Sequence, residues 1–152
     1  MRRLHSLQLT AVTLAALSLA ACDRSQKAAD TAQAERSLYE RLGGKDAITA
    51  VIDDFVANVA ADTRINTRFA NTNIPHLKQM LVDQVCAATG GPCTYTGKTM
   101  GDAHRGMHIT DAEFTALVED LTKTLDKFKV GEREKTELLG ALGGMKGEIV
   151  GA

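Results

Sequence analysis

The sequence predicts an all-α fold, and three observations lead to this prediction. Apolar residues recur three and four positions apart through most of the chain after residue 36, which is the spacing of one helix face. No stretch shows the strict alternation of a half-buried strand. Two capping boxes mark helix starts, one at Ser37-x-x-Glu40 and the other at Thr110-x-x-Glu113. With 152 residues and a net charge of -1, the chain offers one domain and no basic surplus for nucleic acid.

The first half of the folded part contains three predicted helices. The helix opened by Ser37 is very short, because Gly43-Gly44 stops it. From Asp46 a longer helix carries an apolar face made of Ile48, Val51, Ile52, Phe55, Val56 and Val59. Residues 62–73 form a looser stretch. Pro75 suits the first turn of the next helix, whose stripe is Leu77, Met80, Leu81, Gln84, Val85 and Ala88.

The second half contains two further predicted helices. Thr110 opens a long helix whose apolar face is Phe114, Leu117, Val118, Leu121, Leu125 and Phe128. After Val130-Gly131 comes a last helix with Leu138, Leu139, Leu142, Met145 and Ile149 on one face. This helix also contains four glycines, which weaken it or permit the close approach of another helix. They are Gly140, Gly143, Gly144 and Gly147.

Two histidines four residues apart, His104 and His108, lie between these halves in a segment poor in helix formers. A zinc site of the i, i+4 type needs both on one continuous helix. Because Thr110 caps the next helix, a helix carrying His104 must end near Gly106, and His108 then lies in a turn. A third ligand is also unclear, since His76 is the only other histidine after the N-terminal segment. The pattern favours one histidine presented by a short helical stub.

The N-terminal segment resembles a bacterial lipoprotein signal. Arg2 and Arg3 precede an apolar run that is too short to span a bilayer as a stable helix. The run ends in Leu19-Ala20-Ala21-Cys22, which resembles a lipobox, although an ordinary secretory signal with a coincidental cysteine is the alternative. We expect residues 1–21 to be a signal peptide and Cys22 to carry the lipid. Asp23 resembles an inner-membrane retention signal, so the expected location is the periplasmic face of the inner membrane.

The resulting domain organisation is a short tether followed by one globular domain. Residues 22–36 hold no large apolar side chain and cannot bury a core, so they form the tether, and the folded domain covers residues 37–152. Beyond the inner membrane a disulfide between Cys86 and Cys93 is permitted, with a Gly-Gly-Pro turn between them. The alternative is two reduced thiols packed as small apolar groups.

The order of these motifs resembles the group I truncated haemoglobins. The segments that carry the resemblance are "LYERLGG", "AITAVIDDFVANVAAD", Phe69, "LKQMLVDQVCAATGGPCTYTGKTM", "AHRGMHIT" and "EFTALVEDLTKTLDKFKV". The resemblance implies a shortened globin fold, with two helix pairs stacked two-on-two around haem b (iron protoporphyrin IX). It also implies that His104 is the proximal iron ligand and that Phe69 packs on the haem face. No Cys-x-x-Cys-His motif occurs, so we expect the haem to be bound non-covalently.

The resemblance further implies a distal face of unusual composition. Many family members have a tyrosine where this chain has Val56, and polar residues where it has Leu77 and Leu81. Met80 takes a place where some relatives have a sixth iron ligand, and a thioether is able to serve as one, but Met80 as a core filler is the alternative. The expected haem contacts are Phe55, Val56, Phe69, Leu77, Met80, Leu81, Gln84, Val85 and His104.

The function implied by the resemblance is reversible binding of O₂ or another diatomic ligand such as NO or CO, with a reductase as an unknown partner. The alternatives are a haem enzyme for NO or peroxide detoxification and an electron carrier using His104 and Met80. Peroxidase chemistry needs a distal acid or base, and the apolar stripe offers none unless His76 reaches the site. The sequence therefore favours binding over catalysis.

Overall fold

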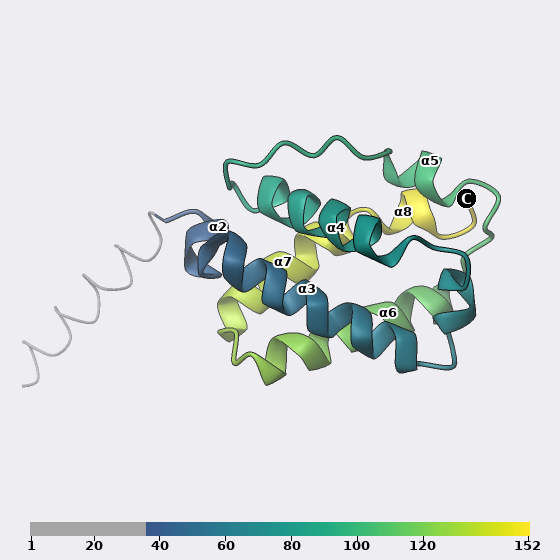
Figure 1. The fold of residues 1–152 in the computed structure, drawn as a ribbon, viewed down its shortest axis with the longest axis horizontal. Helices are drawn as coiled ribbons and strands as arrows, with labels where there is room; N and C mark the ends of the chain where they lie inside the picture. Colours follow the sequence, from purple (N-terminus) through teal and green to yellow (C-terminus); the bar gives the residue numbers. More distant parts are fainter. Residues whose placement is uncertain (1–35) are drawn as a thin grey trace, which may run out of the picture. The chain divides into compact units, whose positions relative to one another are not determined.

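The computed structural model describes residues 36–152, so the predicted signal peptide, the lipidated cysteine and nearly all of the tether lie outside the described residues. In the described part the chain forms helices joined by loops, and no residue belongs to a strand longer than an isolated bridge. The predicted all-α class is confirmed (Figure 1). The helices are α2 (Leu38–Arg41), α3 (Gly44–Ala61), the 3₁₀ helix η1 (Asn66–Phe69), α4 (Ile74–Ala88), α5 (Met100–His104), α6 (Asp111–Lys127), α7 (Glu132–Gly143) and α8 (Lys146–Ile149).

Side-chain caps set the helix starts that the sequence indicated. The side chains of Ser37 and Thr110 each accept a hydrogen bond from the backbone N–H three residues on. The glutamate carboxylate at that position accepts one from the backbone N–H of the cap residue, so both capping boxes are present. Asn73 caps α4, with Pro75 in its first turn. Between α2 and α3 the chain turns at Gly43 and Gly44, whose φ angles of 93° and 77° are open to glycine but costly for other residues.

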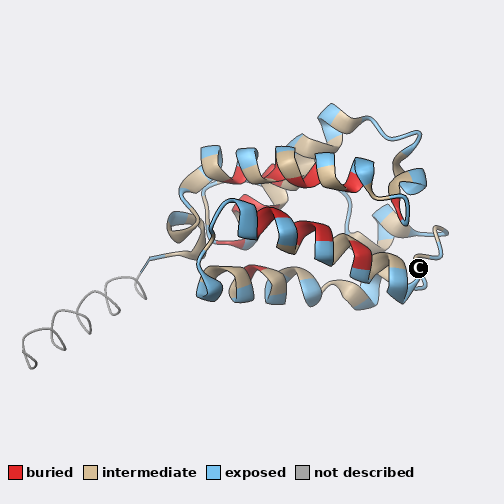
Figure 2. Cartoon of the chain, turned by 90° about the horizontal axis from the view of Figure 1, so that it is seen from below, coloured by how far each residue is buried: buried red, intermediate tan, exposed pale blue. Residues whose placement is uncertain are grey.

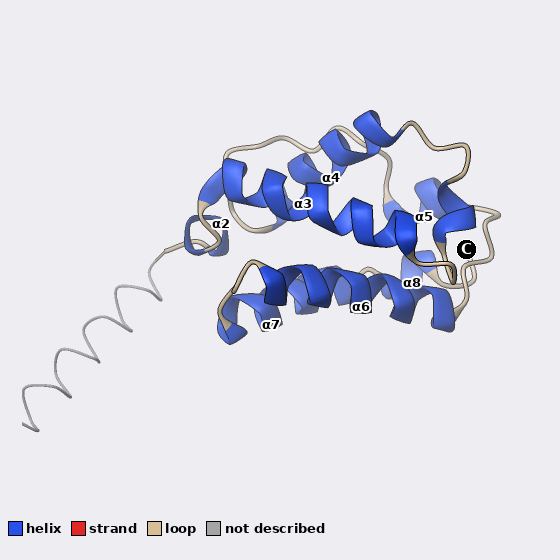
Figure 3. Ribbon diagram, turned by 60° about the horizontal axis from the view of Figure 1, so that its bottom comes forward, coloured by secondary structure: helices blue, strands red, loops and turns tan. Residues whose placement is uncertain are grey.

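The long helices form two stacked pairs around a shared core. Helix α3 packs against α4 and against α6, and α6 packs against α7. Figure 3 shows α3 and α4 in one layer and α6 and α7 in the other, which is the two-on-two arrangement that the resemblance implied. The buried faces of these helices meet in the interior (Figure 2). The core consists of Ile48, Ile52, Phe55, Val56, Val59, Ile65, Val82, Val85, Ala116, Leu121, Leu125 and Leu138.

The prediction of a single last helix after Val130-Gly131 is wrong, because two helices occupy that part of the chain. Helix α7 ends at Gly143, and α8 begins at Lys146. Gly140, Gly143 and Gly144 explain the break, since each glycine costs a helix about 0.8–1 kcal/mol relative to alanine. After the break the chain changes direction, and α8 packs beside α5 (Figure 1).

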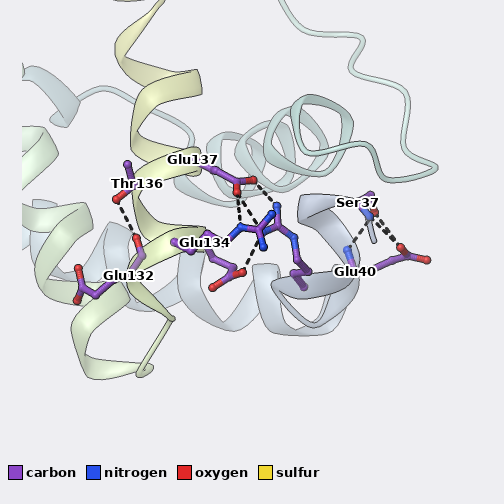
Figure 4. Close-up of polar contacts among 8 residues, drawn as sticks. Ser37, Glu40, Glu132, Glu134, Thr136 and Glu137 are labelled. Atoms are coloured by element: carbon purple, nitrogen blue, oxygen red, sulfur yellow. Dashed lines mark hydrogen bonds and ion pairs between the residues drawn. The ribbon is translucent and has the colours of Figure 1, made fainter. Parts of the chain in front are cut away.

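Helix α2 is held to α7 by a buried arginine. The Arg41 side chain is only 4% exposed, and its guanidinium lies 2.9 Å from the Glu134 carboxylate and also bonds Glu137. Both acceptors come from α7, as Figure 4 shows. The hydrogen bond and charge of Glu137, together with those of Glu134, raise the pKa of Arg41. Among the described residues, no helix has the length and apolar character needed to cross a membrane.

Candidate functional site

A cavity of about 410 Å³ lies between the helices and is lined almost entirely by apolar side chains. This volume falls within the ~300–1,000 Å³ range of pockets that hold small molecules and cofactors. Its walls come from α3, η1, α4, α5, α6, α7 and α8, so residues far apart in the sequence meet there. A cavity of this kind suits a large, mainly apolar ligand.

Eight of the nine residues that the sequence analysis expected against a haem line this cavity. They are Phe55, Val56, Phe69, Leu77, Leu81, Gln84, Val85 and His104. Met80 is the exception, since it does not line the cavity although it is half-buried on α4. At about 100° per residue, Met80 lies on the flank of the stripe formed by Leu77, Leu81 and Val85. The structure therefore does not place Met80 where a sixth iron ligand would have to lie, and core filler is the alternative that its half-buried position fits.

His104 is presented by a five-residue helix with a defined start. Thr99 caps α5 by accepting a hydrogen bond from the N–H of Asp102, and His104 is the last residue of the helix. The ring atom Nδ1 lies 2.9 Å from the carbonyl oxygen of Met100. A carbonyl only accepts, so Nδ1 carries the proton and Nε2 keeps its lone pair. The half-buried ring at the cavity wall is thereby prepared to bind a metal through Nε2.

The other two histidines of the described region do not line the cavity. His108 is exposed in a turn with a φ angle of 49°, as expected once Thr110 caps the next helix. His76 is exposed in the first turn of α4 and gives the cavity no acid or base. Within residues 36–152, no group of three histidine, cysteine, aspartate or glutamate side chains is placed to hold a metal ion. The hypothesis of a zinc site formed by His104 and His108 therefore has no support.

Three polar lining residues were missed by the sequence analysis, namely Arg68, Thr72 and Tyr95. Arg68 contacts the Glu113 carboxylate at 2.6 Å and donates to the carbonyl oxygen of Met107 at 2.8 Å. The hydrogen bond from Arg68, with further bonds from Thr110, lowers the pKa of Glu113 to about 2. The Tyr95 hydroxyl donates to the carbonyl of Lys98. These residues lie in loops or a 3₁₀ turn, where no periodic pattern signals which side chains face inward.

Gln84 is the polar member of the α4 stripe, and its amide is directed at two sulfur atoms. Its Nε2 atom lies 3.5 Å from Sδ of Met100 and 3.6 Å from Sδ of Met145. Thioether sulfur is only a weak acceptor. Gln84 thus links α4 to the start of α5 and to the chain before α8, and it is not committed to a strong partner.

Cys86 and Cys93 are joined by a disulfide in the structure. The two sulfurs are 1.97 Å apart and the Cα atoms 5.7 Å apart. Cys86 is fully buried near the end of α4, directly after the lining residue Val85. The bridge ties the loop that follows α4 back to that helix, two residues before Tyr95. It therefore fixes one edge of the cavity.

The residues of the cavity fit a haem. An iron porphyrin is a large flat apolar ring, which the aliphatic and aromatic walls match, and its iron needs an axial ligand from the protein. His104 meets the chemical requirement for such a ligand, because its second nitrogen is held by a backbone carbonyl. Two helix pairs stacked around an apolar cavity with one such imidazole at its wall define the class of this protein as a haem-binding globin of the short, two-on-two type.

Comparison with known proteins gives the family. The family model described as Bacterial-like globin matches residues 37–150, and the chain belongs to this family. The group 1 truncated hemoglobin GlbN of Mycolicibacterium paratuberculosis is 35% identical over 113 residues, which cover 74% of this chain and 83% of that protein. The group 1 truncated hemoglobin of Tetrahymena thermophila is 36% identical over 97 residues, which cover 64% of this chain and 80% of that protein.

Solved structures agree with the fold. The Fe(III) form of the truncated hemoglobin from Tetrahymena pyriformis has a TM-score of 0.74 and 32% identity, covering 77% of this chain and all of that one. The 2/2 hemoglobin from Synechococcus sp. PCC 7002, in the cyanomet state with covalently attached heme, has a TM-score of 0.68 and 34% identity. That match covers 71% of this chain and 91% of the cyanobacterial one. The predicted membership among group I truncated haemoglobins is thus confirmed.

Proposed function

We propose that the protein binds haem b non-covalently through His104 and uses it to bind O₂ or another diatomic ligand reversibly. The observation that carries the proposal is the hydrogen bond from Nδ1 of His104 to the Met100 carbonyl, which leaves Nε2 as a ligand at the wall of an apolar cavity. When bound, the haem supplies the iron to which a diatomic molecule attaches. The chain itself orients one axial ligand and excludes water from the ring.

The apolar walls favour ligand binding over peroxide chemistry. Val56, Leu77 and Leu81 line the cavity at the places assigned to the distal side, and none of them transfers a proton. His76, the histidine considered as an acid or base, lies outside the lining and is exposed. Because peroxidase chemistry needs a positioned proton donor or acceptor, this cavity supports binding better.

The position of Met80 also argues against a His/Met electron carrier. A sixth iron ligand must reach the cavity, and Met80 is absent from its lining. A ferrous iron held by His104 alone on one side would keep the other side free for a gas. A reductase that keeps the iron ferrous is then the expected protein partner.

Absorption spectroscopy tests the proposal directly. Full-length protein supplied with haemin should give a globin-type ferric spectrum, a five-coordinate ferrous spectrum after reduction, and a shifted Soret band with CO. Reversible recovery of the ferrous spectrum after O₂ removal would support binding. A protein that takes up no haem would refute the proposal, and a six-coordinate ferrous spectrum lost in Met80→Ala would point instead to electron transfer.

We further propose that the protein acts as a lipid-anchored globin on the periplasmic side of the inner membrane. The lipobox-like segment before Cys22 supports this proposal, and the Cys86–Cys93 bridge suits an oxidising compartment. Fractionation of cells that express the full chain should leave the protein with the inner membrane, while Cys22→Ser should release it or block its processing. Soluble processed protein with Cys22 intact would contradict the lipid anchor.

A further inference from the structure

Helix α5, which carries His104, does not stabilise itself. It has five residues, whereas isolated helices shorter than ~12–15 residues are marginal in water. The chain is irregular on both sides of it, over residues 90–99 and again over residues 105–110. The orientation of the His104 ring must therefore come from contacts that other parts of the fold make with α5.

Residues 145–152, which we call the C-terminal strap, supply the backbone part of these contacts. Helix α8 lies beside α5, and a Cβ added at Gly101 would come within 4.0 Å of the Glu148 carbonyl oxygen. Just after α5 the strap forms a parallel bridge with Ile109. There the N–H of Gly151 donates to the Ile109 carbonyl at 2.9 Å, and the N–H of His108 donates to Ala152 at 3.0 Å. The strap thus contacts α5 itself and the turn that follows it.

Side chains anchor the strap to its neighbours. The Lys146 ammonium lies 2.6 Å from the Asp111 carboxylate and 5.6 Å from the centre of the Phe114 ring, which ties the strap to the first turn of α6. Met145, at the start of the strap, shares the Gln84 amide with Met100. Met100 also provides the carbonyl that holds the His104 ring. Met100 therefore connects Gln84 to the His104 ring, and Gln84 in turn connects Met145 of the strap.

We propose that the C-terminal strap, linked through Gln84 and Met100, is the positioning element that holds His104 in the orientation needed to bind the haem iron. This inference rests on the proposed function, in which His104 is the iron ligand. If the strap is loosened, α5 frays, the Met100 carbonyl no longer holds Nδ1, and the lone pair of Nε2 loses its fixed direction.

Gly151→Pro is the variant that tests the backbone contact. Proline has no N–H to donate to Ile109, and it cannot adopt the φ angle of 80° found at Gly151. Glu132→Pro is the matched control, because Glu132 is the first residue of α7, where the N–H has no partner within the helix and proline is well tolerated. Gln84→Leu tests the side-chain link, with Gln79→Leu as its control on the exposed face of α4.

Two readouts apply to the full-length protein. Hydrogen exchange of the amides of residues 101–107 should become at least tenfold faster in Gly151→Pro and to a smaller extent in Gln84→Leu, while the amides of α3 and α6 stay protected. In the haem-loaded ferrous protein, resonance Raman spectroscopy should show a shifted iron–histidine stretching band, and haem loss to an acceptor apoprotein should be at least tenfold faster. Both control variants should match the wild type.

The outcomes separate the possibilities. Unchanged hydrogen exchange in α5 of Gly151→Pro would overturn the positioning role, because the strap would then not hold α5. An equal loss of protection in every helix would overturn it too, because the variant would then destabilise the whole fold. Faster exchange with an unchanged iron–histidine band would also overturn it. A wild-type protein that takes up no haem would refute the proposed function itself, and the exchange data would still decide whether the strap holds α5.

Discussion

The carbonyl oxygen of Met100 lies 2.9 Å from Nδ1 of His104, one helical turn away on the same short helix. This contact decides which ring nitrogen carries the proton, because a carbonyl accepts and does not donate. It leaves Nε2 unprotonated at the wall of the cavity. A helix of five residues is enough for this purpose, since the donor and the acceptor lie four residues apart.

The first prediction concerns the iron ligand. His104→Ala should abolish normal haem retention, because the cavity would lose its one lining imidazole among the described residues. His108→Ala is the matched control, since His108 is exposed and outside the cavity, and it should keep a globin-like spectrum. Soret absorbance after gel filtration of haem-loaded protein measures the effect. The opposite behaviour of the two variants would show that the assignment is wrong.

The second prediction concerns O₂ release. Bound O₂ carries partial negative charge, and a hydrogen bond involving a charged group contributes about 1.5–3 kcal/mol, where ~1.4 kcal/mol is tenfold in an equilibrium constant. Val56 lines the cavity, and its side chain has no hydrogen-bond donor. Val56→Tyr should therefore slow O₂ release by tenfold or more and change CO release little, as followed by stopped-flow absorbance.

Val56→Phe is the control for this experiment, because it adds the same ring without the hydroxyl group. Any steric effect of the ring should appear in CO release as well. Once that effect is allowed for, Val56→Phe should release O₂ at a rate close to that of the wild type. Wild-type release that is already slow would count against an apolar distal face. Gln84 would then be the donor to examine, because its amide is held only by two sulfur atoms.

The third prediction concerns the disulfide. Replacing Cys93 by serine should lower the free energy of unfolding by about 2–3 kcal/mol, the lower part of the usual range, because the bridged cysteines are separated by only seven positions in the sequence. Urea unfolding with and without reductant measures this, and the variant should not respond to reductant. Mass spectrometry of unreduced peptides is the direct check. Two freely alkylated thiols in protein from its native compartment would contradict the bridge.

The fourth prediction concerns pH. Arg68 and Thr110 lower the pKa of Glu113 from 4.5 to about 2, so the folded state binds this proton less readily than the unfolded state. The resulting stabilisation is present above pH 4.5 and is lost as the pH falls toward 2. Glu113→Gln should therefore flatten the decline of the unfolding free energy between these values, as measured by urea titration at several pH values.

Glu148→Gln is the control for the pH experiment, since Glu148 is exposed and makes no ion pair within the described part of the chain. It should leave the slope between pH 4.5 and 2 unchanged. Equal slopes for the wild type and Glu113→Gln would mean that the Arg68–Glu113 pair does not contribute to stability. Part of any loss in Glu113→Gln at neutral pH would come from the cap at Thr110, which Glu113 also completes.

The sequence by itself determined most of the long helices and several of their starts. Capping boxes at Ser37 and Thr110, Pro75 in the first turn of α4, and the glycines at 43 and 44 act within a few residues of the backbone, so local physics suffices to place them. The apolar stripes predicted for α3, α4, α6 and α7 together also supply more than half of the residues that line the cavity. The apolar stripes contain no histidine to bind iron. The order of the motifs indicated His104, because the resemblance to group I truncated haemoglobins implies that it binds the iron.

Only the tertiary structure decided which side chains reach the cavity from loops and from the edges of helices. Met80 shares the stripe of α4 by spacing but lies on its flank. Arg68 enters the cavity from a single 3₁₀ turn and Tyr95 from a loop, and neither segment has an apolar period. The chain breaks its helix at Gly143–Gly144, and the bridge between Ile109 and Val150 then joins residues about 40 positions apart. Such contacts depend on how packed helices direct the chain after them, which local propensity does not encode.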